Sequence, residues 1–141
     1  MGRCLLLGLV VLMMACADEK PDFTGNTPIK INDFNKIFKE AELPISLADT
    51  NLKHYTDTLV IGRKALVQFV PETMVEQIVN KTDKKTVLHP ILRIEKEQEY
   101  YLLLRVQHEN SFEICVLVFS KKNKYLDYQI ITEFKDENKG S

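Results

Sequence analysis

Four apolar runs separated by short charged breaks occupy the C-terminal half of this 141-residue chain. Each break has the length of a hairpin loop, so successive runs are predicted to pair as antiparallel strands. The second and third runs are apolar on both faces, as is typical of central strands that are covered on each side. The runs are 87–95 (VLHPILRIE), 100–107 (YYLLLRVQ), 112–119 (FEICVLVF) and 125–134 (YLDYQIITEF).

Alternation within the runs predicts which side chains share a face. In the third run Phe112, Ile114, Val116 and Val118 are expected on one face, opposite Glu113, Cys115, Leu117 and Phe119. The last run alternates more cleanly, as in an edge strand, with Leu126, Tyr128, Ile130, Thr132 and Phe134 on one face and Asp127, Gln129, Ile131 and Glu133 on the other. Pro90 favours an edge or a bulge, which predicts the first run as an outer strand.

Helical spacing dominates the segments before these runs. Phe34, Ile37, Phe38 and Ala41 form one apolar stripe; Asn32 or Asp33 can cap this helix, and Pro44 prevents its continuation. Residues 61–70 fit a helix or a strand, and 72–80 fit another short helix. The expected fold is therefore α+β, with short N-terminal helices packed on an antiparallel β-meander of about four strands.

The bulk composition places the chain among ordinary globular proteins. Apolar residues make up 45% and charged residues 28%, and the length suits one domain. The net charge of −1 argues against a nucleic-acid binder, which needs an excess of Lys and Arg to neutralise phosphates. No nucleic-acid partner is therefore expected.

The N-terminus has the pattern of a secretory signal peptide. One positive charge, Arg3, precedes an apolar run from Cys4 to Ala15, and Asp18 and Glu19 follow almost directly. This run of 12 residues is too short for a bilayer core, which needs about 20 residues in a helix. The small residue Ala15 stands where a signal-peptide cleavage site requires one.

The stretch Met13-Met14-Ala15-Cys16 resembles the lipobox of bacterial lipoproteins, although Met13 stands where leucine is commonest. The resemblance implies cleavage between Ala15 and Cys16, and fatty acyl chains (such as palmitate) on Cys16. Two or three such chains hold a domain firmly at a membrane, because each buried methylene contributes about 0.8 kcal/mol. The expected location is the cell envelope, anchored to the outer membrane on its periplasmic or surface face.

The predicted organisation follows from this leader. Residues 1–15 are the lipoprotein signal peptide, 16–30 an acidic and flexible tether, 31–135 a single globular α+β domain, and 136–141 a charged tail. The tether assignment depends on two prolines, one glycine and the lack of any helical or alternating period.

No residue is predicted to be catalytic, to bind a cofactor or to hold a metal. The histidines His54, His89 and His108 form no zinc motif. His89 and His108 are nevertheless expected at the same open end of the first two strands, where they could approach each other. Cys115 is expected to be a buried structural thiol. Adjacent Tyr100 and Tyr101 are expected on opposite faces.

The leading functional expectation is a non-enzymatic binding or interaction module, anchored by lipidated Cys16 and able to bind a protein partner. Two alternatives stay open. One is a small envelope enzyme, a hydrolase or a metal-dependent enzyme, that uses His89 or His108 with nearby carboxylates such as Glu95 or Glu109. The other is an assembly component that pairs with a partner through a sheet edge.

Overall fold

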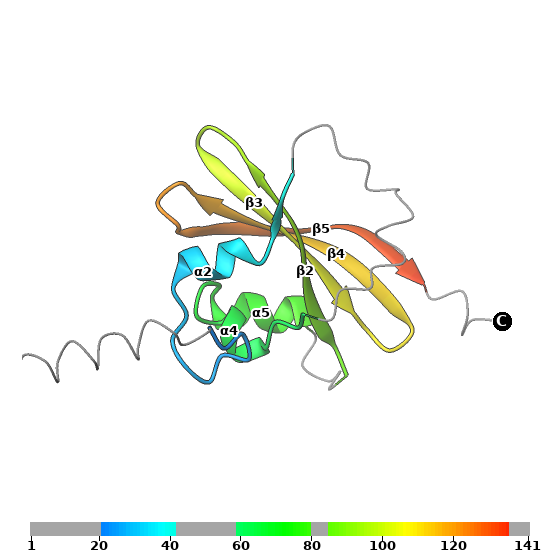
Figure 1. Ribbon diagram of the computed structural model, residues 1–141. Helices are drawn as coiled ribbons and strands as arrows, with labels where there is room; N and C mark the ends of the chain where they lie inside the picture. The colour runs from blue at the N-terminus through cyan, green and yellow to red at the C-terminus, as the bar shows by residue number, and fades with distance from the viewer. Residues whose placement is uncertain (1–20, 42–58, 80–84, 136–141) are drawn as a thin grey trace, which may run out of the picture.

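The computed structural model of the protein describes residues 21–41, 59–79 and 85–135. In these residues five strands form a mixed sheet with the order β1-β2-β3-β4-β5, and short helices lie on one side of it (Figure 1). The predicted α+β class is confirmed, with five strands instead of about four. The elements are α2 (Ile31–Lys36), β1 (Lys39–Glu40), α4 (Arg63–Leu66), α5 (Glu72–Val79), β2 (Val87–Glu95), β3 (Glu99–Gln107), β4 (Ser111–Ser120) and β5 (Tyr125–Lys135).

The predicted meander is present as strands β2 to β5. Each strand begins and ends within one residue of its apolar run, and all three neighbouring pairs are antiparallel. The connections are tight: the Lys96 amide donates to the Glu99 carbonyl at 2.9 Å, and the Ser120 amide donates to the Lys124 carbonyl at 2.8 Å. Local alternation and short polar breaks were therefore sufficient signals for these four strands.

The first helix is shorter than expected, because residues 39–40 form a fifth strand, β1. The helix α2 ends at Lys36, and β1 pairs in parallel with Leu92 and Arg93 of β2. Lys30, without a side-chain hydrogen bond, is the N-cap, rather than Asn32 or Asp33. Phe34 and Phe38 are buried as the helical stripe required. Side chains four residues apart share a face in a helix and also in a strand, so the burial of Phe34 and Phe38 does not distinguish the two. The edge of β2 offers backbone hydrogen bonds to an extended segment, and this favours a strand at Lys39–Glu40.

The position of β2 differs from the expected outer position, because β1 lies outside it. A register shift between Pro90 and Leu92 places Pro90 beside a β-bulge. On one side of Pro90 the Ile61 amide donates to the Leu88 carbonyl at 2.8 Å, and on the other side β1 begins to pair. Pro90 has no amide hydrogen to offer, so its place at a bulge is the physically suitable one.

Helices α4 and α5 confirm the helical expectation for residues 72–80 and divide residues 61–70 between two conformations. Ile61 is extended and bridges Leu88, whereas the helix α4 begins two residues later. Val75 and Ile78 of α5 are buried against the sheet. Among the described residues no helix has the length and apolar character that crossing a bilayer requires.

Residues 21–30, within the predicted tether, pack against the body of the domain. Ile29 is buried and Phe23 lies against the core. The Gln68 side chain accepts from the Ile29 amide at 2.8 Å and donates to the Thr27 carbonyl at 3.0 Å. The other residues of the predicted tether, 16–20, lie outside the described residues.

The sheet carries two separate apolar clusters, one on each face. The larger cluster lies between the sheet and the helices and contains Phe34, Leu66, Leu102, Leu117 and Phe119. The smaller cluster lies on the opposite face. The predicted face assignment of residues 112–119 is confirmed, because the smaller cluster contains Phe112 and Ile114 with Val116 packed against it, whereas Cys115 belongs to the larger one.

Strand β5 does not keep the strict alternation predicted for residues 125–134. Register shifts at Ile114/Cys115 and at Val118/Phe119 leave Ile131 and Leu126 as extra residues on β5. Each extra residue reverses the alternation that follows it. Leu126 therefore shares a face with Gln129 and Ile131, while Tyr128 packs against the larger cluster on the helix side.

Candidate functional site

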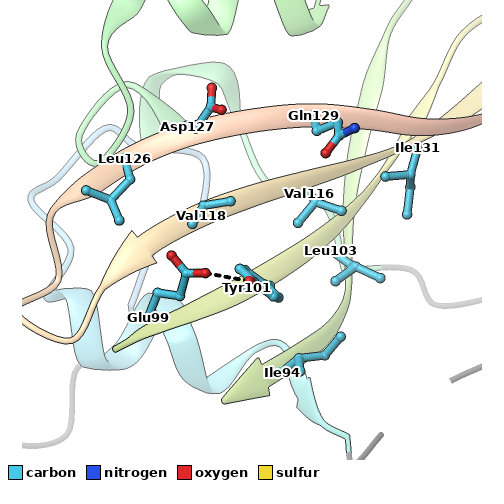
Figure 2. Close-up of a pocket in the computed structure, with 10 residues that line it drawn as sticks. All are labelled: Ile94, Glu99, Tyr101, Leu103, Val116, Val118, Leu126, Asp127, Gln129 and Ile131. Carbon is cyan, nitrogen blue, oxygen red and sulfur yellow. Dashed lines mark hydrogen bonds between the residues drawn. The ribbon is translucent and has the colours of Figure 1, made fainter. Parts of the chain in front are cut away.

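An apolar groove lies on the sheet face that is opposite the helices. Its volume is about 570 Å³, which falls within the usual range for ligand sites. Figure 2 shows side chains from β2, β3, β4 and β5 along it. The groove is lined by Ile94, Glu99, Tyr101, Leu103, Val116, Val118, Leu126, Asp127, Gln129 and Ile131.

Cross-strand register builds the centre of the groove. Tyr101 lies opposite Val118, and Leu103 lies opposite Val116, on neighbouring strands β3 and β4. Ile94 of β2 flanks them on one side, and Ile131 of β5 on the other (Figure 2). Because β-branched and aromatic side chains stand nearly perpendicular to a sheet, this pattern leaves a continuous apolar surface.

Acidic side chains mark one end of the groove. Glu99 begins β3 and Asp127 lies near the start of β5, so both are at the end where the β2–β3 and β4–β5 hairpins turn. The Tyr101 hydroxyl donates to the Glu99 carboxylate (Figure 2). This hydrogen bond raises the pKa of Tyr101, because the neighbouring carboxylate disfavours a phenolate.

The open edge of β5 lies beside the groove. Among the described residues no strand pairs with the outer side of β5, which is 11 residues long. Leu126 and Ile130 are exposed on this strand, at 53% and 38% of their full surface. Leu126 lines the groove, whereas Ile130 is opposite Cys115 and faces the helix side.

The structure does not pair the two described histidines, His89 and His108. Both lie at the predicted open end of β2 and β3, but His89 Nδ1 is 2.8 Å from the Leu59 carbonyl oxygen. His108 Nδ1 is 3.2 Å from Thr86 Oγ1, and its Nε2 is 3.5 Å from Glu113. Leu88 packs on the helix face, so the adjacent His89 side chain lies on the groove face. Glu113, which is the neighbour of His108, lies on the helix face.

The two carboxylates named as their catalytic companions also have other partners. Glu109 is 3.1 Å from Lys85 Nζ, and Glu95, at the far end of β2, forms ion pairs with Arg93 and Lys121. In the described ranges no group of three or more His, Cys, Asp or Glu residues could hold a metal ion. Among the described residues, His108 lies beside the Glu113 carboxylate, which the enzyme hypothesis did not name.

The remaining predictions have different outcomes. Cys115 is buried, and burial raises the pKa of its thiol to about 12. Tyr100 and Tyr101 lie on opposite faces as expected, since Tyr100 belongs to the larger cluster and Tyr101 to the groove. Ala15, Cys16, His54 and the tail at 136–141 lie outside the described residues.

Sequence reasoning did not find the groove itself. The apolar residues on the second face of β3 and β4 indicated that both faces would be covered, whereas the described helices cover one face only. The chain matches no protein-family model, no curated protein and no solved structure in the comparisons that were made.

Proposed function

We propose that this protein is a bacterial envelope lipoprotein, anchored to the outer membrane through Cys16, that binds a protein partner on the open face of its sheet. The observation that carries the binding role is the apolar groove beside the open edge of β5. The anchoring role is supported by the leader that ends at Cys16 and by its resemblance to the lipobox. The proposed role is non-enzymatic.

The occupant that suits this surface is an extended, apolar segment of a partner protein. An open strand edge presents backbone donors and acceptors that an added strand can satisfy, and alternate side chains of that strand would lie over the groove. The exposed Leu126 joins the two features, because it lies on the edge strand and lines the groove. The same geometry accommodates the assembly role that the sequence left open.

Charge adds a preference to this occupant. Glu99 and Asp127 make the hairpin end of the groove acidic. A Lys or Arg in the partner segment would be attracted to that end and would fix the direction in which the segment lies. The proposed partner segment is therefore apolar, extended and basic at one end.

Site-specific photo-cross-linking in intact cells of the native host tests this proposal. A photo-reactive amino acid in place of Leu126 should give discrete adducts with a partner protein. The same amino acid in place of Glu72, exposed on α5 at the helix side, should not. Val118→Lys should reduce the Leu126 adducts by about fivefold or more, because it places a charge in the groove.

Val60→Lys is the matched control, since Val60 is exposed at 45% and does not line the groove. It should leave the adducts unchanged. Equal adducts at positions 126 and 72, or adducts that survive Val118→Lys, would contradict the proposal. An adduct with the mass of two copies of this chain would identify self-association instead of a separate partner.

A further inference from the structure

A second hollow, which we call the polar cleft, lies on the helix side between α2 and the hairpin end of the sheet. Its volume is about 290 Å³, and every side chain that lines it is polar. The cleft is lined by residues of α2, β2, β3 and the turn between β4 and β5. They include Asn35, Lys36, Arg93, Tyr100 and Lys121. This composition contrasts with the apolar groove, which lies on the other face of the same sheet.

A hydrogen-bonded series holds the inner wall of the polar cleft. Asn35 Nδ2 donates to the Tyr100 hydroxyl at 3.0 Å, and this hydroxyl donates to Asn123 Oδ1 at 2.8 Å. The Tyr100 ring stacks on Phe119, with ring centroids 5.5 Å apart. Asn123 adopts a left-handed φ of 65°, which asparagine tolerates better than most residues. The wall is thus positioned in advance of any ligand.

Two polar atoms at the polar cleft have no hydrogen-bond partner. One is Oδ1 of Asn35, whose residue is only 6% exposed, and the other is Nε of Arg93. Glu95 Oε1 lies 3.5 Å from Arg93 Nε, which is an ion-pair distance without hydrogen-bond geometry. Buried polar atoms in native proteins nearly always have a partner, so each exception needs an explanation. Both atoms are buried behind the wall of the cleft, each with less than 1 Å² of accessible surface, so the cleft offers a ligand its other polar groups.

The charges around the polar cleft favour an anionic ligand. Lys36, Arg93 and Lys121 line it against a single carboxylate, Glu95. Glu95 forms ion pairs with Arg93 and Lys121, and Arg93 Nη2 also lies 3.6 Å from Glu40. The ammonium group of Lys36 carries the positive charge that remains in excess. A ligand carboxylate near Lys36 would balance it.

We propose that the polar cleft binds a small carboxylate that carries several hydroxyl groups, such as a sugar acid. Hydroxyl groups can bond to the side-chain amides of Asn32 and Asn123, which line the cleft, and the carboxylate completes the charge balance. The volume is close to the lower limit of about 300 Å³ for small-molecule sites, which favours a ligand the size of one sugar ring. This site is independent of the proposed partner surface.

Titration of the full-length protein in detergent with D-glucuronate tests this inference, with chemical shifts or heat as the readout. The wild-type protein should bind glucuronate saturably. Lys36→Ala and Lys121→Ala should each weaken binding by about fivefold, because each removes a positive charge from the cleft. Lys122→Ala is the matched control, because Lys122 is exposed in the same turn and does not line the cleft.

Two further probes separate the contributions of charge and hydroxyl groups. D-Glucose has the ring hydroxyls without the charge, and inorganic phosphate has the charge without the ring. Each should bind at least about tenfold more weakly than glucuronate, because each lacks one set of contacts. Phosphate binding as tight as glucuronate binding, no glucuronate binding, or an equal loss in Lys122→Ala would overturn the inference.

Discussion

The thiol of Cys115 lies in the core between the sheet and the helices, where its residue has no solvent-exposed surface. Burial is the largest cause of its high pKa of about 12, and the nearby Glu113 carboxylate raises the pKa further. The thiolate is the reactive form of cysteine, so Cys115 is expected to be chemically inert at neutral pH. Its role at the residue scale is that of a small apolar side chain.

The high pKa of Cys115 predicts a loss of stability in alkali. In the unfolded chain the thiol ionises above its ordinary pKa of about 9, whereas in the folded chain it stays protonated until the pH approaches 12. The stability that the protonated, buried thiol provides is therefore fully present below pH 9 and declines as the pH rises toward 12. Between about pH 8 and about pH 10.5, Cys115 should lower the free energy of unfolding by about 2 kcal/mol.

Urea unfolding of the wild-type protein and of Cys115→Ala at these two pH values measures this contribution. The variant loses some stability at both pH values, because it leaves a small cavity. The informative quantity is the decrease in the free energy of unfolding from the lower to the higher pH. This decrease should be smaller in Cys115→Ala than in the wild type. The same decrease in both proteins would show that the Cys115 thiol does not carry the effect.

At the scale of elements, the segment before α2 and the start of α4 approach each other through their backbones. The Gly62 amide donates to the Phe23 carbonyl at 2.7 Å. A Cβ atom on Gly62 would lie 2.2 Å from the Thr24 carbonyl oxygen, and one on Gly25 would lie 2.1 Å from the Ala65 amide nitrogen. Both contacts are with backbone atoms, so a methyl group can enter only if an element shifts.

Gly62→Ala should therefore lower the free energy of unfolding by about 2–4 kcal/mol, as overpacking does at close contacts. Gly62 has a φ of −71°, so the effect reports steric contact rather than backbone strain. Asn26→Ala, at an exposed position in the same segment, should change stability by less than about 0.5 kcal/mol. Urea unfolding measures both variants, and equal losses would contradict the proposed close packing.

The elements also show where local patterns stop being sufficient. Residues 87–135 form the predicted strands because their alternation and their hairpin-length breaks agree over many residues. The spacing of Phe34, Ile37 and Phe38 fits a helix, yet the chain turns extended at Lys39 because the edge of β2 is available there. An interaction between residues 39 and 92 leaves no signal in a local window.

At the scale of the whole molecule, the proposed lipid anchor predicts how the protein divides between detergent and water. Cys16→Ala should move the protein from the detergent phase to the aqueous phase, because the acyl chains would have no thiol to attach to. Cys4→Ala is the matched control, since Cys4 lies in the predicted leader. It should leave the protein in the detergent phase. Equal partition of the wild type and Cys16→Ala would contradict the anchor.

The sequence by itself determined the α+β class, the positions of four strands, the opposite faces of Tyr100 and Tyr101, and the burial of Cys115. Each of these follows from alternation over a few residues, which is a local property. Only the tertiary structure decided the pairing of β1 and the bulges in β5, and the bulges determine which β5 residues line the groove. These features depend on contacts between distant residues, and one extra residue in a strand reverses every face that follows.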